Sequence, residues 1–187
     1  MTMKKKHTAF QQFGYHAWAN RKFFDHLESL PEDVYTQKVE SVFATIRDVI
    51  VHIYQVDSMW LSVMSGDSFR KTMALIKEHE EKSTGRSLQD MRVLYEESER
   101  SYSDFFGQLY DPDADLTIRH PRFGKLDTSV ADLVRHVANH GTYHRGNITA
   151  MLRQMGHSGV STDYVFYLFE LNGPSEQDVP DGGQDGS

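Results

Sequence analysis

ADLVRHVANHGTYHRGNITAMLRQM, residues 131–155, decides the fold expected for this chain of 187 residues. Its apolar side chains recur at alternating spacings of three and four, which is the pattern of a helix that buries one face. The helix is expected to begin near Thr128 or Ser129. His140 and His144 fall within the same narrow stripe as the apolar residues. Those apolar residues are Leu133, Val137, Ile148, Met151 and Met155.

Three earlier segments show the same spacing, over about residues 8–30, 45–66 and 87–110. The second of them starts with Thr45 followed three residues later by Asp48, which resembles a capping box. Each segment is about twenty residues long and therefore forms about 30 Å of helix. Four such helices predict an all-α fold, a four-helix bundle.

The connecting segments predict smaller elements. LTIRHPRFGKLDT, residues 116–128, alternates weakly around a turn and predicts a short hairpin or an extended crossover between the third and fourth helices. Residues 65–86 are interpreted as a charged linker with one extra turn, and DYVFYLFEL, residues 163–171, as a short helix or strand. We expect one domain over residues 1–170 and a disordered tail over residues 171–187, which are rich in Gly, Pro and Asp.

The bulk composition excludes several classes of protein. No apolar run approaches the roughly eighteen residues of a membrane span, and the basic start MTMKKKHTAFQQF lacks the apolar segment of a secretion signal. We therefore expect a soluble, cytoplasmic protein with no membrane partner. The formal net charge of −7 disfavours a broad phosphate-binding surface, so nucleic acid is not an expected partner.

The chain contains no cysteine. This excludes iron–sulfur clusters, thiolate zinc sites, disulfides and a cysteine nucleophile. Histidine, aspartate and glutamate are the remaining side chains that could bind a metal ion. If the chemistry of this protein uses a thiol, that thiol must come from another molecule.

His140 and His144 occupy positions where leucine would serve, and burying two imidazoles is unfavourable unless each finds a partner. Their spacing of four residues lets both side chains converge on one metal ion. His52 lies inside an apolar arc of the second helix and could supply a third ligand across the bundle. The other interpretation is ordinary: core histidines that bond to carbonyl groups or tyrosines. The residues alone leave both interpretations open.

His136 lies about 80° away from the stripe and about 12 Å along the axis from His144, so these two cannot share one ion. We expect His136 to donate to a carboxylate or to cap a neighbouring helix. Gly141 follows His140 where a zinc protease of the HExxH type has glutamate, which disfavours that mechanism. Other candidates for support of the site, for proton transfer or for holding a cofactor carboxylate are His16, Asp57, Asn139, Tyr143, Arg145 and Arg153.

Four stretches together resemble the DinB family, which comprises DNA-damage-inducible proteins that share their fold with the YfiT-like metal-dependent enzymes. The stretches are YHAWANRKFFDHL, FATIRDVIVHI, HVANHGTYHRGNI and GHSGVSTDY, and the resemblance covers about residues 8–170. It implies a divalent metal ion, typically nickel or zinc, held by His52, His140 and His144, with water in the remaining positions. It also implies a homodimer, because members of the family commonly pair through helix faces.

The family is similar to enzymes that use low-molecular-weight thiols, including bacillithiol S-transferases and a mycothiol-dependent isomerase. Our leading hypothesis is therefore a transferase in which the metal lowers the pKa of a bound thiol or water, and the nucleophile attacks a small-molecule electrophile. One alternative is hydrolysis by metal-activated water. A second alternative is a non-catalytic stress protein in which the metal stabilises the helices and has a fourth protein ligand.

Overall fold

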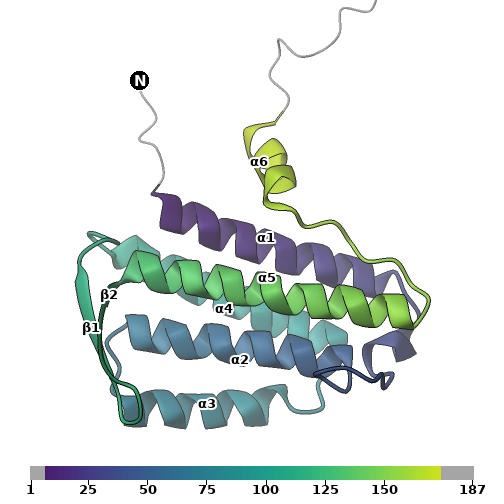
Figure 1. Ribbon diagram of the computed structural model, residues 1–187, viewed down its shortest axis with the longest axis horizontal. Helices are drawn as coiled ribbons and strands as arrows, with labels where there is room; N and C mark the ends of the chain where they lie inside the picture. The colour runs from purple at the N-terminus through teal and green to yellow at the C-terminus, as the bar shows by residue number, and fades with distance from the viewer. Residues whose placement is uncertain (1–6, 174–187) are drawn as a thin grey trace, which may run out of the picture.

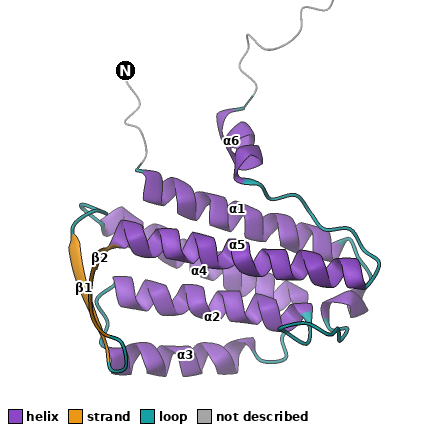
Figure 2. Cartoon of the chain, in the orientation of Figure 1, coloured by secondary structure: helices purple, strands orange, loops and turns teal. Residues whose placement is uncertain are grey.

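The computed structural model describes residues 7–173, which are mostly helical with one small two-stranded sheet (Figures 1 and 2). The elements, in chain order, are α1 (Thr8–Glu28), the 3-10 helix η1 (Glu32–Tyr35), α2 (Ile46–Met64), α3 (Phe69–Ser83), α4 (Leu88–Gln108), β1 (Asp115–His120), β2 (Gly124–Ser129), α5 (Val130–Gln154) and α6 (Tyr164–Asn172). Across this part of the chain, no helix combines the length and the apolar content needed to cross a membrane.

The four predicted long helices appear as α1, α2, α4 and α5, and local capping explains where they start. Thr45 Oγ1 accepts a hydrogen bond from the Asp48 amide at 3.2 Å, and Asp48 Oδ2 accepts one from the Thr45 amide at 3.1 Å. The capping box expected from the sequence is thereby confirmed. Ser87 starts α4 with a second capping box, and Ser129 caps α5. Each cap satisfies amides that the first helical turn would leave unpaired.

Figure 1 shows α1, α5 and α2 side by side, with α4 behind them. Two clusters of buried apolar side chains fill the space between these helices. One cluster contains Phe24 and Met151, and the other contains Phe13 and Val134. Along α1, Asn20 lies between the two clusters, and His16, one turn before it, is only 1% exposed. A polar layer therefore interrupts the apolar core.

The sequence-based interpretation of residues 65–86 as a linker is wrong, because most of this segment forms α3. Ser68 caps the helix by accepting from the Lys71 amide at 3.3 Å, and α3 then packs along α2. Its two buried residues are polar, Thr72 and Ser83. A helix that buries hydroxyl groups carries little of the apolar periodicity from which helices are predicted. The packing of this segment against α2 therefore stabilises it as the helix α3.

The predicted hairpin is confirmed. Strands β1 and β2 pair antiparallel, from Asp115 opposite Ser129 to His120 opposite Gly124. Gly124 has a φ of 83°, a left-handed conformation that glycine adopts without the strain other residues would suffer. Because Ser129 both ends β2 and caps α5, the hairpin leads directly into the helix that carries His140 and His144.

The sequence predicts either a short helix or a strand for residues 163–171, and the structure shows that they form the helix α6. This helix lies against α1, where Trp18 Nε1 donates to Glu170 Oε2 at 2.7 Å and Lys22 pairs with the same carboxylate. Helix α6 extends to Asn172, so the predicted domain boundary after residue 170 falls inside a helix. Most of the predicted tail, residues 174–187, lies outside the described residues.

Burial lowers the pKa of His79 on α3, and the nearby Lys82 ammonium lowers it further. The His79 ring stacks on Tyr54 with centroids 5.2 Å apart, and its Nδ1 is buried without a hydrogen-bond partner in the described structure. The unfolded chain therefore takes up a proton below about pH 6.5 that the folded chain resists. Stability should fall as the pH drops through this range.

His79→Gln should reduce this acid sensitivity, because glutamine has no group that titrates there. Urea denaturation at pH 7 and pH 5 measures the effect. We expect the variant to lose less unfolding free energy between the two pH values than the wild type. An equal loss in both proteins would contradict the assignment of this acid sensitivity to His79.

Candidate metal centre

Three histidines from two helices meet at the interface of α2 and α5. One ring nitrogen from each of His52, His140 and His144 lies within 4.8 Å of the other two. The Nε2 atoms of His52 and His140 are 3.2 Å apart, and the ring centroids are separated by 4.4 to 5.1 Å. The structure therefore brings together the three residues that the sequence singled out.

Helical geometry explains this convergence. His140 and His144 are one turn apart on α5, so their side chains lie one above the other facing α2. His144 is 7% exposed, whereas His52 and His140 are half-buried. The Phe43 ring, from the segment that precedes α2, packs against His52 and His144 with centroids 5.2 and 5.4 Å away. The imidazoles are thus shielded from water on one side.

Burial also determines the protonation of the three rings. Loss of solvation, followed by repulsion from His144 and His52, lowers the pKa of His140 to about 3. Desolvation is likewise the main cause that lowers the pKa of His52 and that of His144. All three imidazoles are therefore neutral near pH 7. Neutral imidazole is the form that binds metal ions.

The donor set fits a divalent metal ion. Two nitrogens that each lie about 2.0–2.1 Å from a tetrahedral zinc ion are about 3.3 Å apart, close to the distance between His52 and His140. His140 Nδ1 is buried and lacks a hydrogen-bond partner within residues 7–173, while His144 Nδ1 lies 3.3 Å from Asn147 Nδ2. Asn147 was not predicted as part of the site. Its spacing of three residues from His144 could have indicated it.

His136 does not join this group. Its ring centroid is 6.1 Å from that of His140, and it packs edge-on against Trp60 at 4.9 Å. We thus find His136 beside an indole, where the sequence predicted a carboxylate or a helix end. Tyr143 is 66% exposed and its ring meets His144 at 5.0 Å, so it stands at the edge of the site.

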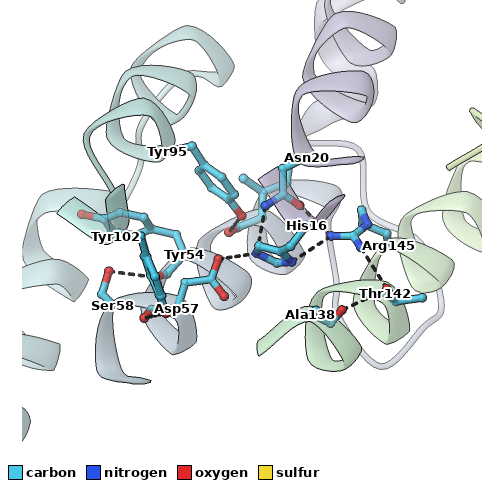
Figure 3. Close-up of polar contacts among 11 residues, drawn as sticks. His16, Asn20, Tyr54, Asp57, Ser58, Tyr95, Tyr102, Ala138, Thr142 and Arg145 are labelled. Atoms are coloured by element: carbon cyan, nitrogen blue, oxygen red, sulfur yellow. Dashed lines mark hydrogen bonds and ion pairs between the residues drawn. The ribbon is translucent and has the colours of Figure 1, made fainter. Parts of the chain in front are cut away.

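The expectation that Arg145 holds a cofactor carboxylate is wrong, because this side chain is 2% exposed and points toward α1 (Figure 3). Its Nη1 donates to Asn20 Oδ1 at 2.8 Å and to His16 Nδ1 at 3.2 Å, and its Nη2 donates to Thr142 Oγ1 at 3.0 Å. One step along a helix turns the side chain by about 100°, so Arg145 and its neighbour His144 face different helices.

The other candidate residues divide between the interior and the surface. Asp57 is buried, and its Oδ2 accepts from His16 Nε2 at 2.8 Å, so these two belong with Arg145 in one polar network (Figure 3). Asn139 and Arg153 are exposed. The signal for the network was present in α1, where His16 and Asn20 are one turn apart within an apolar pattern. Their partners on other helices could not be found from that pattern.

Two comparisons with known proteins show what this chain is similar to. The sequence model of the DinB family matches residues 1–178. The chain is also 40% identical to Protein DinB of Bacillus subtilis (strain 168) over 161 residues, which cover 86% of this chain and 94% of that protein. The chain belongs to the DinB family.

Membership of the DinB family extends over every helix and strand described above, since the match spans residues 1–178. It therefore includes both helices that carry the three histidines. The resemblance inferred from four short stretches is confirmed. For this DinB-family protein, the histidine group is the leading candidate for a metal site.

Proposed function

We propose that this DinB-family protein binds one divalent metal ion through His52, His140 and His144 and acts as a thiol-dependent S-transferase. The observation that carries the proposal is the convergence of three neutral imidazole nitrogens from two helices within 4.8 Å. Three imidazoles suit zinc and nickel, which are the metals we propose. Metal dependence also agrees with membership of the family.

The coordination favours a reactive metal over a purely structural one. Within residues 7–173, the group consists of the three histidines without a fourth protein ligand. Three protein ligands with an open position are typical of catalytic zinc sites, whereas structural sites have four. His52, His140 and His144 would hold the metal ion, which would lower the pKa of a thiol or water molecule at the open position.

The surrounding residues would position the reactants. Phe43 covers His52 and His144 and excludes water from that side, while the exposed Tyr143 ring packs edge-on against His144. The cysteine-free chain requires an external thiol, for which we propose a low-molecular-weight thiol such as bacillithiol. In the transfer, the thiol sulfur bonds to an electrophilic carbon of a small-molecule substrate as the leaving group departs, and the thiol proton goes to solvent.

We further propose that α1, α2, α4 and α5 constitute a four-helix bundle of the DinB/YfiT-like type, to which α3, α6 and the hairpin are additions. The contacts among these four helices and their shared apolar clusters support this assignment. The net charge of −7 supports a function without nucleic acid as partner.

Metal content tests the ligand assignment. His52→Ala, His140→Ala and His144→Ala should each lower bound zinc from about one ion per chain to near zero, because two imidazoles hold a metal ion far more weakly than three. Mass spectrometry of the bound metal, on dialysed protein without a histidine tag, measures this. His136→Ala is the matched control and should keep its metal. Unchanged metal content in the first three variants would rule out the site.

Activity assays decide which reactant the site uses. We expect the zinc- or nickel-loaded protein to couple bacillithiol to at least one of a panel of electrophiles, and removal of the metal with a chelator should abolish the product. Chromatography of the thioether product provides the measurement. Turnover that persists without any thiol would identify a hydrolase instead. Absence of metal-dependent turnover with both thiol and water would argue for a non-catalytic protein.

We also propose that the protein forms a homodimer through α6. This helix exposes Val165, Phe166, Phe169 and Leu171, and Phe169 is 72% exposed. Contiguous exposed apolar side chains are typical of protein interfaces. Sedimentation should give twice the chain mass of 21.6 kDa for the wild type and the single mass for Phe169→Asp. Tyr110→Asp, at a fully exposed loop position, is the control; a monomeric wild type would refute the proposal.

A further inference from the structure

A layer of buried polar side chains crosses the core and joins α1, α2 and α5 (Figure 3). Its central members, His16, Asp57 and Arg145, are 1%, 5% and 2% exposed. Asp57 Oδ2 lies 2.8 Å from His16 Nε2, and Arg145 Nη1 lies 3.2 Å from His16 Nδ1. A single imidazole on α1 therefore links a carboxylate on α2 to a guanidinium on α5.

The partners of His16 determine where its proton lies. An arginine side chain only donates hydrogen bonds, so His16 Nδ1 must accept from Arg145. The ring proton then sits on Nε2 and is donated to the Asp57 carboxylate, so the Asn20 Nδ2 atom, 3.1 Å from Nε2, lies beside this bond without donating to the ring. A buried charge that loses its partner is strongly unfavourable, so this orientation of the ring is the one that keeps both charges bonded. These hydrogen bonds require a particular orientation of donor and acceptor, whereas the apolar packing on either side of the network does not.

Gly141 makes room for this arrangement. A Cβ atom at this position would overlap the Cε1 and Nδ1 atoms of His16 and would approach Arg145 Nη1 to 2.8 Å. Glycine is unfavourable in the middle of a helix, and Gly141 lies well inside α5. The close approach of the His16 ring to the α5 backbone accounts for the presence of glycine at this position.

The three imidazoles lie on α2 and α5, and the network includes residues of both these helices. On α5, Gly141 follows His140 and Arg145 follows His144, so ligand and network positions are adjacent in sequence. On α2, Asp57 lies on the same helix as His52. Helices α2 and α5 are thus each bonded to α1 at the level of the candidate metal centre.

We infer that the His16 network is a positioning device, which holds α2 and α5 in the register that brings His52, His140 and His144 together before a metal ion binds. This inference rests on the proposed metal site. Without a metal ion, His52 and His140 can share one N–H···N hydrogen bond between their Nε2 atoms, 3.2 Å apart, and no hydrogen bond joins either ring to His144 within residues 7–173. One such bond cannot fix three rings on two helices, so their convergence needs support from other contacts. The directional bonds from α1 provide this support.

Gly141→Ala tests the inference, because the added methyl group displaces the His16 ring without altering a metal ligand. We expect the affinity for Co²⁺, measured by competition titration, to fall about 10- to 100-fold, the range typical of groups that orient metal ligands. The visible absorption of bound Co²⁺ should also change, since it reports the coordination geometry.

A second background separates positioning from general damage to α5. His16→Ala removes the linking ring, introduces no overlap, and should weaken Co²⁺ binding to a similar extent. In that background, Gly141→Ala should cause little further loss, because the methyl group then approaches only Arg145 Nη1, the end of a flexible side chain that can move aside. An undiminished loss in the His16→Ala background would overturn the inference, as would wild-type affinity in both single variants.

The control must destabilise the protein without touching the network. Met91→Ala removes a fully buried side chain of α4, and should lower the unfolding midpoint while leaving the Co²⁺ affinity and spectrum unchanged. Weaker Co²⁺ binding by this control, to the same extent as by Gly141→Ala, would reduce the network to a merely structural role and overturn the inference.

A measurement without metal keeps the inference separate from the proposed function. In the metal-free protein, amide hydrogen exchange at residues 138–146 should become faster in His16→Ala and stay at the wild-type rate in Met91→Ala. If the wild type binds no Co²⁺, the proposed metal site fails, and exchange alone decides whether the network holds α5 in place. Unchanged exchange in His16→Ala would overturn the inference.

Discussion

The structure depends on a buried pair of opposite charges that never touch directly. Asp57 and Arg145 come from different helices, and the ring of His16 bonds to both of them. Taking such groups out of water is costly, and replacing buried ion pairs by apolar side chains is often stabilising. Their presence therefore points to a need for geometric precision more than for stability. The two apolar clusters fill the space on either side, and the polar layer between them sets how the helices align.

Helix α5 contacts α1 and α2 through different faces, because successive residues turn by about 100° around its axis. Its positions 140 and 144 face α2 and present imidazoles, whereas positions 141 and 145 face α1 and belong to the polar network. Two of the three proposed metal ligands and two members of the network region thereby lie within six consecutive residues of α5. These two sets of contacts account for the occurrence of two histidines, a glycine and an arginine, none of them a good core residue, in the middle of the longest helix among residues 7–173.

The protonation of the three histidines is consistent with a metal site on the face of α5 that contacts α2. Burial keeps the imidazoles of His52, His140 and His144 neutral by lowering the pKa of each, and a neutral imidazole is ready to bind a cation. The chain has no cysteine that could close the site with a fourth, thiolate ligand. His52 and His140 are half-buried, so the candidate site is not sealed inside the core.

The sequence by itself determined the long helices, the capping box at Thr45, the hairpin and the three histidines, because helical periodicity, end caps and turns depend on residues that are close in the chain. It could not determine α3, which buries hydroxyl groups. Nor could it place Arg145, whose partners come from residues 125 and 129 positions away. Only the tertiary structure decides which helix faces which side chain, since a buried polar group is recognised by its partner and not by its own position in a pattern.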